Sequence, residues 1–101
     1  MPVKCMQKER SLTAAVTGEL DHHRARELME ELDRQIDLGR PGELILDLKG
    51  LTFTDSSGIA VLLRSWKRME QVKGTFRVVN VPEQADKVFR AAGLQRIMRF
   101  E

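Results

Sequence analysis

The segment Thr54-Asp55-Ser56-Ser57-Gly58 contains the residues of this sequence best suited to chemistry, because two adjacent hydroxyls follow a carboxylate. Asp and Ser side chains at the start of a helix accept hydrogen bonds from its unpaired N–H groups. A phosphate on a serine there would also be stabilised, since a helix N-terminus attracts negative charge. Residue chemistry alone leaves both interpretations open, a helix cap and a modification site.

Nucleophilic catalysis by these serines lacks its usual sequence context. A nucleophile elbow has the pattern Gly-x-Ser-x-Gly, which this segment does not match. Only His22 or His23 is available as a general base, and the fold would have to bring it to the serines. A small hydrolase that uses Ser57 and a histidine stays as a minor alternative. We expect the protein not to be an enzyme and to have no catalytic residues.

The sequence also predicts no metal site and no cofactor. His22 and His23 are adjacent, so their side chains on a helix point about 100° apart and cannot share one metal ion. Cys5 is the single cysteine and has no CxxC or histidine partner nearby. No glycine-rich loop of a known nucleotide-binding type occurs in the sequence.

Composition describes an ordinary globular domain with a nearly balanced charge. The 101 residues are 42% hydrophobic and 32% charged, which suffices for one modest core. The net charge of +2 is the difference between 17 basic and 15 acidic residues, which are interleaved along the chain. Nucleic-acid binders usually show a basic stripe with aromatic residues nearby. We therefore expect no nucleic-acid partner.

The sequence predicts a cytoplasmic protein that does not contact a membrane. No apolar run approaches the roughly 20 residues that span a bilayer, and the first ten residues lack the apolar core of a signal peptide. The lone Cys5 allows no internal disulfide, which fits a reducing compartment.

Hydrophobic periodicity predicts the elements before the serine pair. Alternation over residues 3–8 and 11–17 indicates a hairpin that turns near Glu9 and Arg10. Asp21 is then expected to cap a helix. The apolar stripe of that helix has the spacing of one buried face and consists of Ala25, Leu28, Met29, Leu32 and Ile36. Glu30 and Arg34 are expected to pair on its other side, and Gly39 and Pro41 to end it.

The central strand and the helix after the serines are predicted next. Leu44, Ile45 and Leu46 in succession indicate a central parallel strand that is covered on both faces. The following helix is expected to end at Lys73 and Gly74. Its buried face is expected to contain Ile59, Leu62, Leu63, Trp66 and Met69.

The C-terminal third is predicted to contain a strand, a third helix and a final extended segment. The run TFRVVNV reads as the strand, and Pro82 is expected in the first turn of the helix. Val88, Phe89 and Ala92 are expected on the core side of that helix, and Gly93 at its end. The run RIMRF is expected to form a short edge strand or a docked segment.

The predicted order is therefore β-β-α-β-α-β-α with a possible last strand. This order indicates an α/β fold, with a mixed sheet, an N-terminal hairpin and helices packed on the sheet. We expect one domain over residues 1–101. The absence of a second apolar face on the helices favours a monomer.

Three runs of the sequence together resemble a known family. GELDHHRARELMEEL, LILDLKGLTFTDSSGIAVLL and AAGLQRIMRFE are similar to the anti-sigma factor antagonists of the STAS domain family. The resemblance covers nearly the whole chain, and GELDHH favours the sporulation branch, which acts on sigma-F, over the stress-response branch. The sequence departs from the frequent family pattern Ser-Gly-Leu-Gly at Ala60, which puts the choice of partner in doubt more than the family.

The resemblance implies a binding switch. The unphosphorylated antagonist binds an anti-sigma factor that is also a serine kinase, and this releases the sigma factor for transcription. The kinase uses ATP to phosphorylate the serine that precedes the glycine, here Ser57, and a phosphatase reverses the modification. A scaffold module of a larger stress-signalling complex is the alternative. The partner-binding surface implied by the family motif comprises Asp21, His22, His23, Thr54, Asp55, Ser56, Gly58, Ile59 and Ala60.

Overall fold

The computed structural model describes residues 3–101, and its elements follow the predicted order. Two strands precede the first helix, after which strands and helices alternate. The elements are β1 (Val3–Lys8), β2 (Ser11–Leu20), α1 (His22–Gly39), β3 (Glu43–Thr54), α2 (Ser57–Gln71), β4 (Thr75–Val79), α3 (Glu83–Ala91), a short 3-10 helix η1 (Leu94–Arg96) and β5 (Arg99–Phe100). The predicted final edge strand is thus confirmed as β5, although it is only two residues long.

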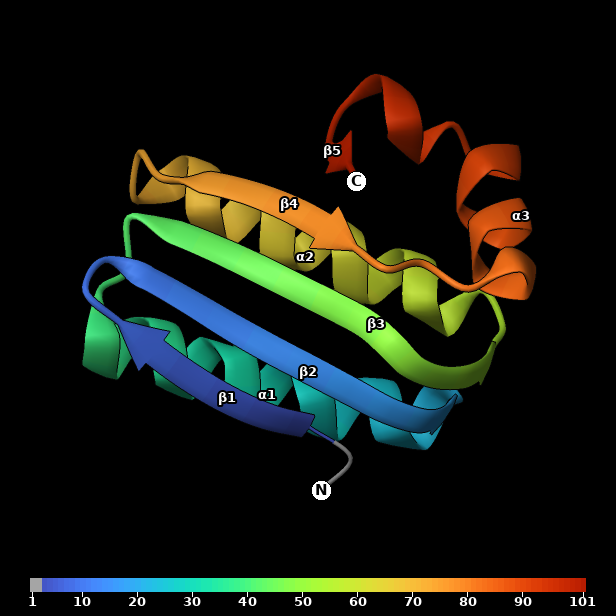
Figure 1. Cartoon of the computed structure of the whole chain (residues 1–101), viewed down its shortest axis with the longest axis horizontal. Coiled ribbons are helices and arrows are strands. Elements are labelled where there is room, and N and C mark those ends of the chain that lie inside the picture. The colour runs from blue at the N-terminus through green and yellow to red at the C-terminus, as the bar shows by residue number, and fades with distance from the viewer. Residues whose placement is uncertain (1–2) are drawn as a thin grey trace.

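The five strands form one mixed sheet in the order β1-β2-β3-β4-β5. The β1–β2 hairpin is antiparallel, whereas β3, β4 and β5 each run parallel to the preceding strand. Parallel neighbours require crossover connections, and the helices supply them. The predicted α/β fold with an N-terminal hairpin is therefore confirmed (Figure 1).

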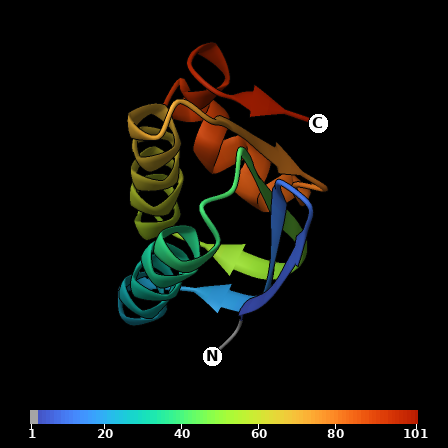
Figure 2. The ribbon, with the colours of Figure 1, turned by 90° about the vertical axis from the view of Figure 1, so that its left-hand side faces the viewer.

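Helices α1 and α2 pack side by side on one face of the sheet, and the other face carries no helix (Figures 1 and 2). Burial along β3 alternates accordingly. Leu44 and Leu46 are fully buried beneath the helices, whereas Ile45 on the opposite face is only partly buried. The prediction that this strand is covered on both faces was therefore wrong, although its central position between two parallel strands was right.

The β1–β2 hairpin turns at Glu9 and Arg10, as predicted. Glu9 takes the left-handed conformation, with φ of 57°, that a glycine or asparagine more often supplies in such turns. Left-handed backbone also ends α1, but it falls on Arg40 (φ 44°) and not on Gly39. Gly39 instead lies against the end of the exposed Gln7 side chain, whose amide donates to the Gly39 carbonyl at 3.1 Å.

Helix α1 begins as predicted, with Asp21 as its cap. The Asp21 carboxylate accepts a hydrogen bond from the N–H of Arg24 at 2.9 Å. The predicted pairing of Arg34 with Glu30 is wrong, since Arg34 donates to Glu31 at 2.6 Å and 3.2 Å. Both acidic residues lie within one turn of the arginine, and the three-residue spacing is the one the structure adopts.

Helix α2 buries a face that is rotated from the predicted one. Its buried residues are Gly58, Val61, Leu62, Ser65 and Met69. Ile59, Leu63 and Trp66, which were predicted on the core face, are only partly buried at its margin. The cause is a small polar residue in the stripe, because the buried Ser65 hydroxyl donates to the carbonyl of Val61 at 2.8 Å.

Helix α3 lies beyond the end of the sheet at which β3 and β4 finish (Figure 1). Pro82 occupies the cap position, one residue before its predicted place, and Gly93 ends the helical segment with φ of 78° as expected. Phe89 is fully buried and Val88 partly, but Ala92 is exposed, so its predicted core position was wrong.

Candidate functional site

The serine pair lies where two parallel strands end together. Leu20, the last residue of β2, is paired with Thr54, the last residue of β3. Helix α1 then begins after Asp21, and α2 begins at Ser57. The register of the sheet therefore brings the two predicted motifs, GELDHH and TDSSG, to the same edge, although they are more than thirty residues apart in the sequence.

Asp55 caps α2, and the neighbouring serine does not. The N–H of Ser57 donates to the Asp55 carboxylate at 2.7 Å. Ser56 occupies the position before the helix but makes no side-chain capping bond. The N–H of Ser57, followed by its hydroxyl and with a smaller contribution from His22, holds the pKa of Asp55 below its ordinary value. A charged carboxylate thus fixes the backbone of Ser57.

Ser57 is the first residue of α2 and lines a shallow groove of about 310 Å³ between α1 and α2. Its side chain is partly exposed at this groove. The other lining residues are His22, Ala25, Arg26, Met29 and Ala60. Arg26 was not among the predicted site residues, and its i, i+4 spacing from His22 is the only sequence signal that could have indicated it.

Thr54 and Gly58 support the junction from below. Thr54 is fully buried, and its hydroxyl donates to the carbonyls of Asp55 at 3.0 Å and Leu20 at 3.4 Å. Gly58 is also buried, and a Cβ at this position would overlap Thr54 Oγ1 and lie 3.2 Å from Phe89. Glycine follows Ser57 because the helix passes too close to β3 and α3 for a side chain.

Gln84 of α3 holds the end of β3 and was missed by the sequence reasoning. Its side-chain amide donates to the Thr54 carbonyl at 2.8 Å, and its carbonyl oxygen accepts from the Thr54 N–H at 3.0 Å. The side chain thereby replaces a neighbouring strand at the point where β4 has already ended. Nothing in the local sequence marks this glutamine, because its partner is thirty residues away.

The predicted partner-binding residues divide into exposed and supporting groups. Asp21 is exposed beside the start of α1, and His22 lines the Ser57 groove. His23 is exposed too, but its imidazole lies 3.5 Å from the Glu27 carboxylate and does not line the groove. Ile59 is partly buried against the core. The predicted residues exposed at this edge are therefore Asp21, His22, His23, Asp55, Ser56 and Ala60, and Ser57 is partly exposed beside them.

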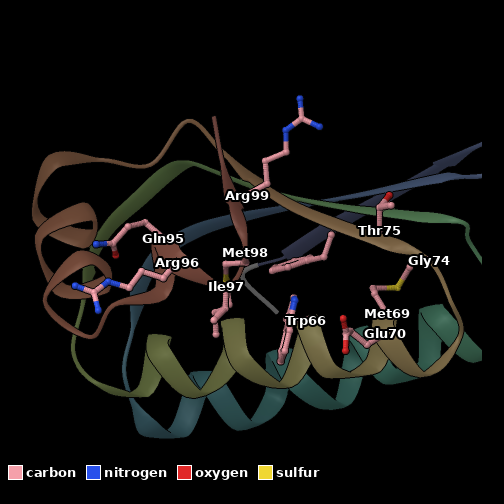
Figure 3. Close-up of a pocket in the computed structure, with 11 residues that line it drawn as sticks. Trp66, Met69, Glu70, Gly74, Thr75, Gln95, Arg96, Ile97, Met98 and Arg99 are labelled. Atoms are coloured by element: carbon pink, nitrogen blue, oxygen red, sulfur yellow. The ribbon is translucent and has the colours of Figure 1, made fainter.

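A second hollow of about 450 Å³ lies between α2, β4 and the C-terminal segment (Figure 3). Trp66, Met69 and Ile97 line its apolar part, and Glu70 and Arg96 its polar part. It shares no lining residue with the Ser57 groove and contains none of the predicted site residues. The sequence-predicted chemistry therefore points to the junction and not to this hollow.

Within residues 3–101, no group of three or more His, Cys, Asp or Glu side chains is placed to hold a metal ion. No helix in the described part of the chain has the length and apolar character needed to cross a bilayer.

Comparison with known proteins assigns the chain to a family. The model of the STAS domain matches residues 4–101. An anti-sigma F factor antagonist from Paenibacillus polymyxa is 33% identical over 87 residues, which are 86% of this chain and 74% of the relative.

Two solved structures of the anti-sigma factor antagonist SpoIIAA share the fold, each at 27% sequence identity. The unphosphorylated form gives a TM-score of 0.85 and covers 98% of this chain and 87% of its own. The phosphorylated form of this Bacillus protein gives 0.76 and covers 98% and 90%. With the mixed sheet and the two covering helices described above, these similarities show that the chain belongs to the STAS domain family.

Proposed function

We propose that this protein is an anti-sigma factor antagonist of the sporulation type. Its unphosphorylated form binds an anti-sigma factor that is also a serine kinase, and this releases a sigma factor that activates transcription. The observation that carries the proposal is the position of Ser57, partly exposed at the start of α2, in a fold whose similar proteins are named anti-sigma factor antagonists. One of them has been solved with and without phosphate.

Phosphorylation at Ser57 is the proposed off state. The phosphate adds close to two negative charges at neutral pH, and the N-terminal end of α2 stabilises them by about 0.3–1 kcal/mol. The fold therefore tolerates the modification. A partner docked over the groove would instead meet the added negative charge, and a loss of about 2.7 kcal/mol already weakens binding 100-fold.

The partner surface that we propose has an exposed rim and a supporting base. The rim consists of the exposed residues at the starts of α1 and α2, namely Asp21, His22, His23, Asp55, Ser56 and Ala60. Thr54, Gly58 and Ile59 act from beneath by fixing the path of the chain. A serine phosphatase that acts on the phosphorylated form would restore binding, and the protein would act as a monomer in the cytoplasm, where transcription takes place.

We further propose that the protein has no catalytic activity of its own. The group bonded to Ser57 is the Asp55 carboxylate, whose lowered pKa makes it a poor base at neutral pH. The hydrolase alternative would need His22 in that place. A scaffold role in a larger stress-signalling complex stays as the second candidate.

The modification site can be tested with the cognate anti-sigma kinase and ATP. Mass spectrometry is expected to show one added phosphate, located on Ser57. Ser57→Ala is expected to abolish labelling, while Ser56→Ala, the adjacent hydroxyl without a capping bond, is expected to keep it. Normal labelling of Ser57→Ala would contradict the assignment.

A further inference from the structure

The α1 wall of the Ser57 groove carries a cationic side chain, Arg26, that was not among the predicted site residues. His22 and Arg26 are four residues apart, so they lie one turn from each other on the same side of α1. Both line the groove together with Ser57. A cationic side chain thus shares a small recess of about 310 Å³ with the proposed phosphate acceptor.

Neighbouring arginines are engaged elsewhere, which distinguishes Arg26. Arg24 donates to the backbone carbonyl of Glu19 at 3.2 Å. Arg64 of α2 forms an ion pair with Asp33 at 2.6 Å. Arg26 is exposed, and within residues 3–101 its guanidinium makes no ion pair or side-chain hydrogen bond. Its charge is therefore available to a new anion in the groove.

We propose that Arg26 binds the phosphate of phosphorylated Ser57 within the same molecule. The proposal rests on the proposed function, since it supplies the structural consequence of that modification. A guanidinium offers paired N–H donors whose geometry matches two phosphate oxygens, and an ion pair strengthens these hydrogen bonds. His22 on the same wall offers a further ring N–H.

The consequence is a two-part change in the surface that faces the partner. In the unphosphorylated protein, Arg26 presents a positive charge beside Ser57. After phosphorylation the guanidinium is held by the phosphate, so a partner loses a cationic contact and meets a site that is negative overall. Phosphorylation of one serine on α2 would thereby also change the charge that α1 presents to the partner.

The other charged side chains at this edge cannot bind the phosphate in place of Arg26. The Asp55 carboxylate already accepts from the N–H of Ser57, and the Asp21 carboxylate accepts from the N–H of Arg24. Both would repel a phosphate, and both are unchanged in the variants used below. The comparison between variants therefore isolates the contribution of the Arg26 guanidinium.

The test uses the full chain with phosphoserine at position 57, installed by genetic encoding so that no kinase is needed. A ³¹P NMR titration measures the second pKa of the phosphate, which is about 6 for a free phosphoserine. A nearby cation lowers this pKa. Arg26→Gln is expected to raise it by about 0.2–0.7 pH unit, the size of an exposed ion pair.

Two matched variants define the outcome. Arg24→Gln removes a charge from the same helix turn without altering the groove, and it is expected to leave the phosphate pKa unchanged. Arg26→Lys keeps a positive charge, so its phosphate pKa is expected to lie between those of the parent and Arg26→Gln proteins. An equal pKa in the parent and Arg26→Gln proteins, or an equal rise in Arg24→Gln, would overturn the proposal. Failure of the kinase to label Ser57 would instead count against the proposed function, and the two failures are distinguishable.

Discussion

Asp55 connects the helix cap with the proposed switch. Both a serine and an aspartate were good capping candidates by residue type, and the structure assigns the bond to the aspartate. Ser56 makes no capping bond. The bond from the Ser57 N–H to Asp55 fixes the backbone there, and the Ser57 side chain lines the groove. The sequence could not show which residue caps the helix and which residue begins it, because these roles change if the helix begins one residue earlier or later.

This assignment predicts a pH-dependent stability. The folded pKa of Asp55 lies below its unfolded value, so the carboxylate stabilises the fold above the ordinary value of 3.8. That contribution is lost as the pH falls through the lower, folded value. Urea unfolding should therefore show a less stable Asp55→Asn protein at pH 7, and the difference should vanish in acid.

Ser56→Ala is the matched control for this measurement. It is expected to change the free energy of unfolding by no more than about 0.5 kcal/mol at either pH. Equal stabilities of Asp55→Asn and the parent protein at pH 7 would show that the negative charge of Asp55 does not stabilise the start of α2, because an asparagine oxygen can still accept from the Ser57 N–H.

At the scale of elements, Gly58 sets how closely α2 approaches β3 and α3. A methyl group at this position would overlap Thr54 Oγ1 and press on Phe89. Helix propensity alone predicts that Gly58→Ala stabilises α2 by up to about 1 kcal/mol. Packing predicts the opposite sign, a loss of about 1–3 kcal/mol, because both neighbours are fully buried. Urea unfolding distinguishes the two.

Ala60→Gly tests the same helix turn on its exposed side. It removes an exposed methyl group, and it should cost at most about 1 kcal/mol through helix propensity. A Gly58→Ala protein as stable as the parent would show that Thr54 and Phe89 move aside, and that the glycine is not required by the packing of α2.

The positions of the helices and strands along the chain were largely predictable from the sequence, whereas the face that each one buries was less predictable. Periodicity identified α1, α2 and α3 and the order of strands and helices along the chain, because each apolar stripe is long enough to set a period. It misplaced the buried face of α2, where the small polar Ser65 lies in the core with its hydroxyl bonded to Val61. It also overestimated the burial of Ile45, since three consecutive apolar residues do not show that one face of the sheet lacks a helix.

At the scale of the whole molecule, the site is a product of sheet topology. Because β2 and β3 are parallel and in register at Leu20 and Thr54, the helices that follow both strands begin side by side. The family motif predicted most of the residues at that edge. Arg26 and Gln84 were not predicted, since their importance depends on contacts with residues about thirty positions away.

The same topology places the proposed switch, Ser57, away from the contacts that stabilise the domain. Ser57 lies at the margin of the core, and the α1–α2 contact is held farther along by the pairs Arg64–Asp33 and Arg68–Asp37. A phosphate at Ser57 should therefore leave the free energy of unfolding within about 1 kcal/mol of its original value. We therefore expect the proposed modification to act on binding and not on folding.

The affinity for the cognate anti-sigma factor, measured by isothermal titration calorimetry before and after phosphorylation of Ser57, tests this central claim most directly. The unphosphorylated protein is expected to bind, and the phosphorylated protein to bind at least about 100-fold more weakly. Thermal unfolding of both forms should be nearly the same. Equal affinity of the two forms would contradict the proposal that Ser57 is the switch.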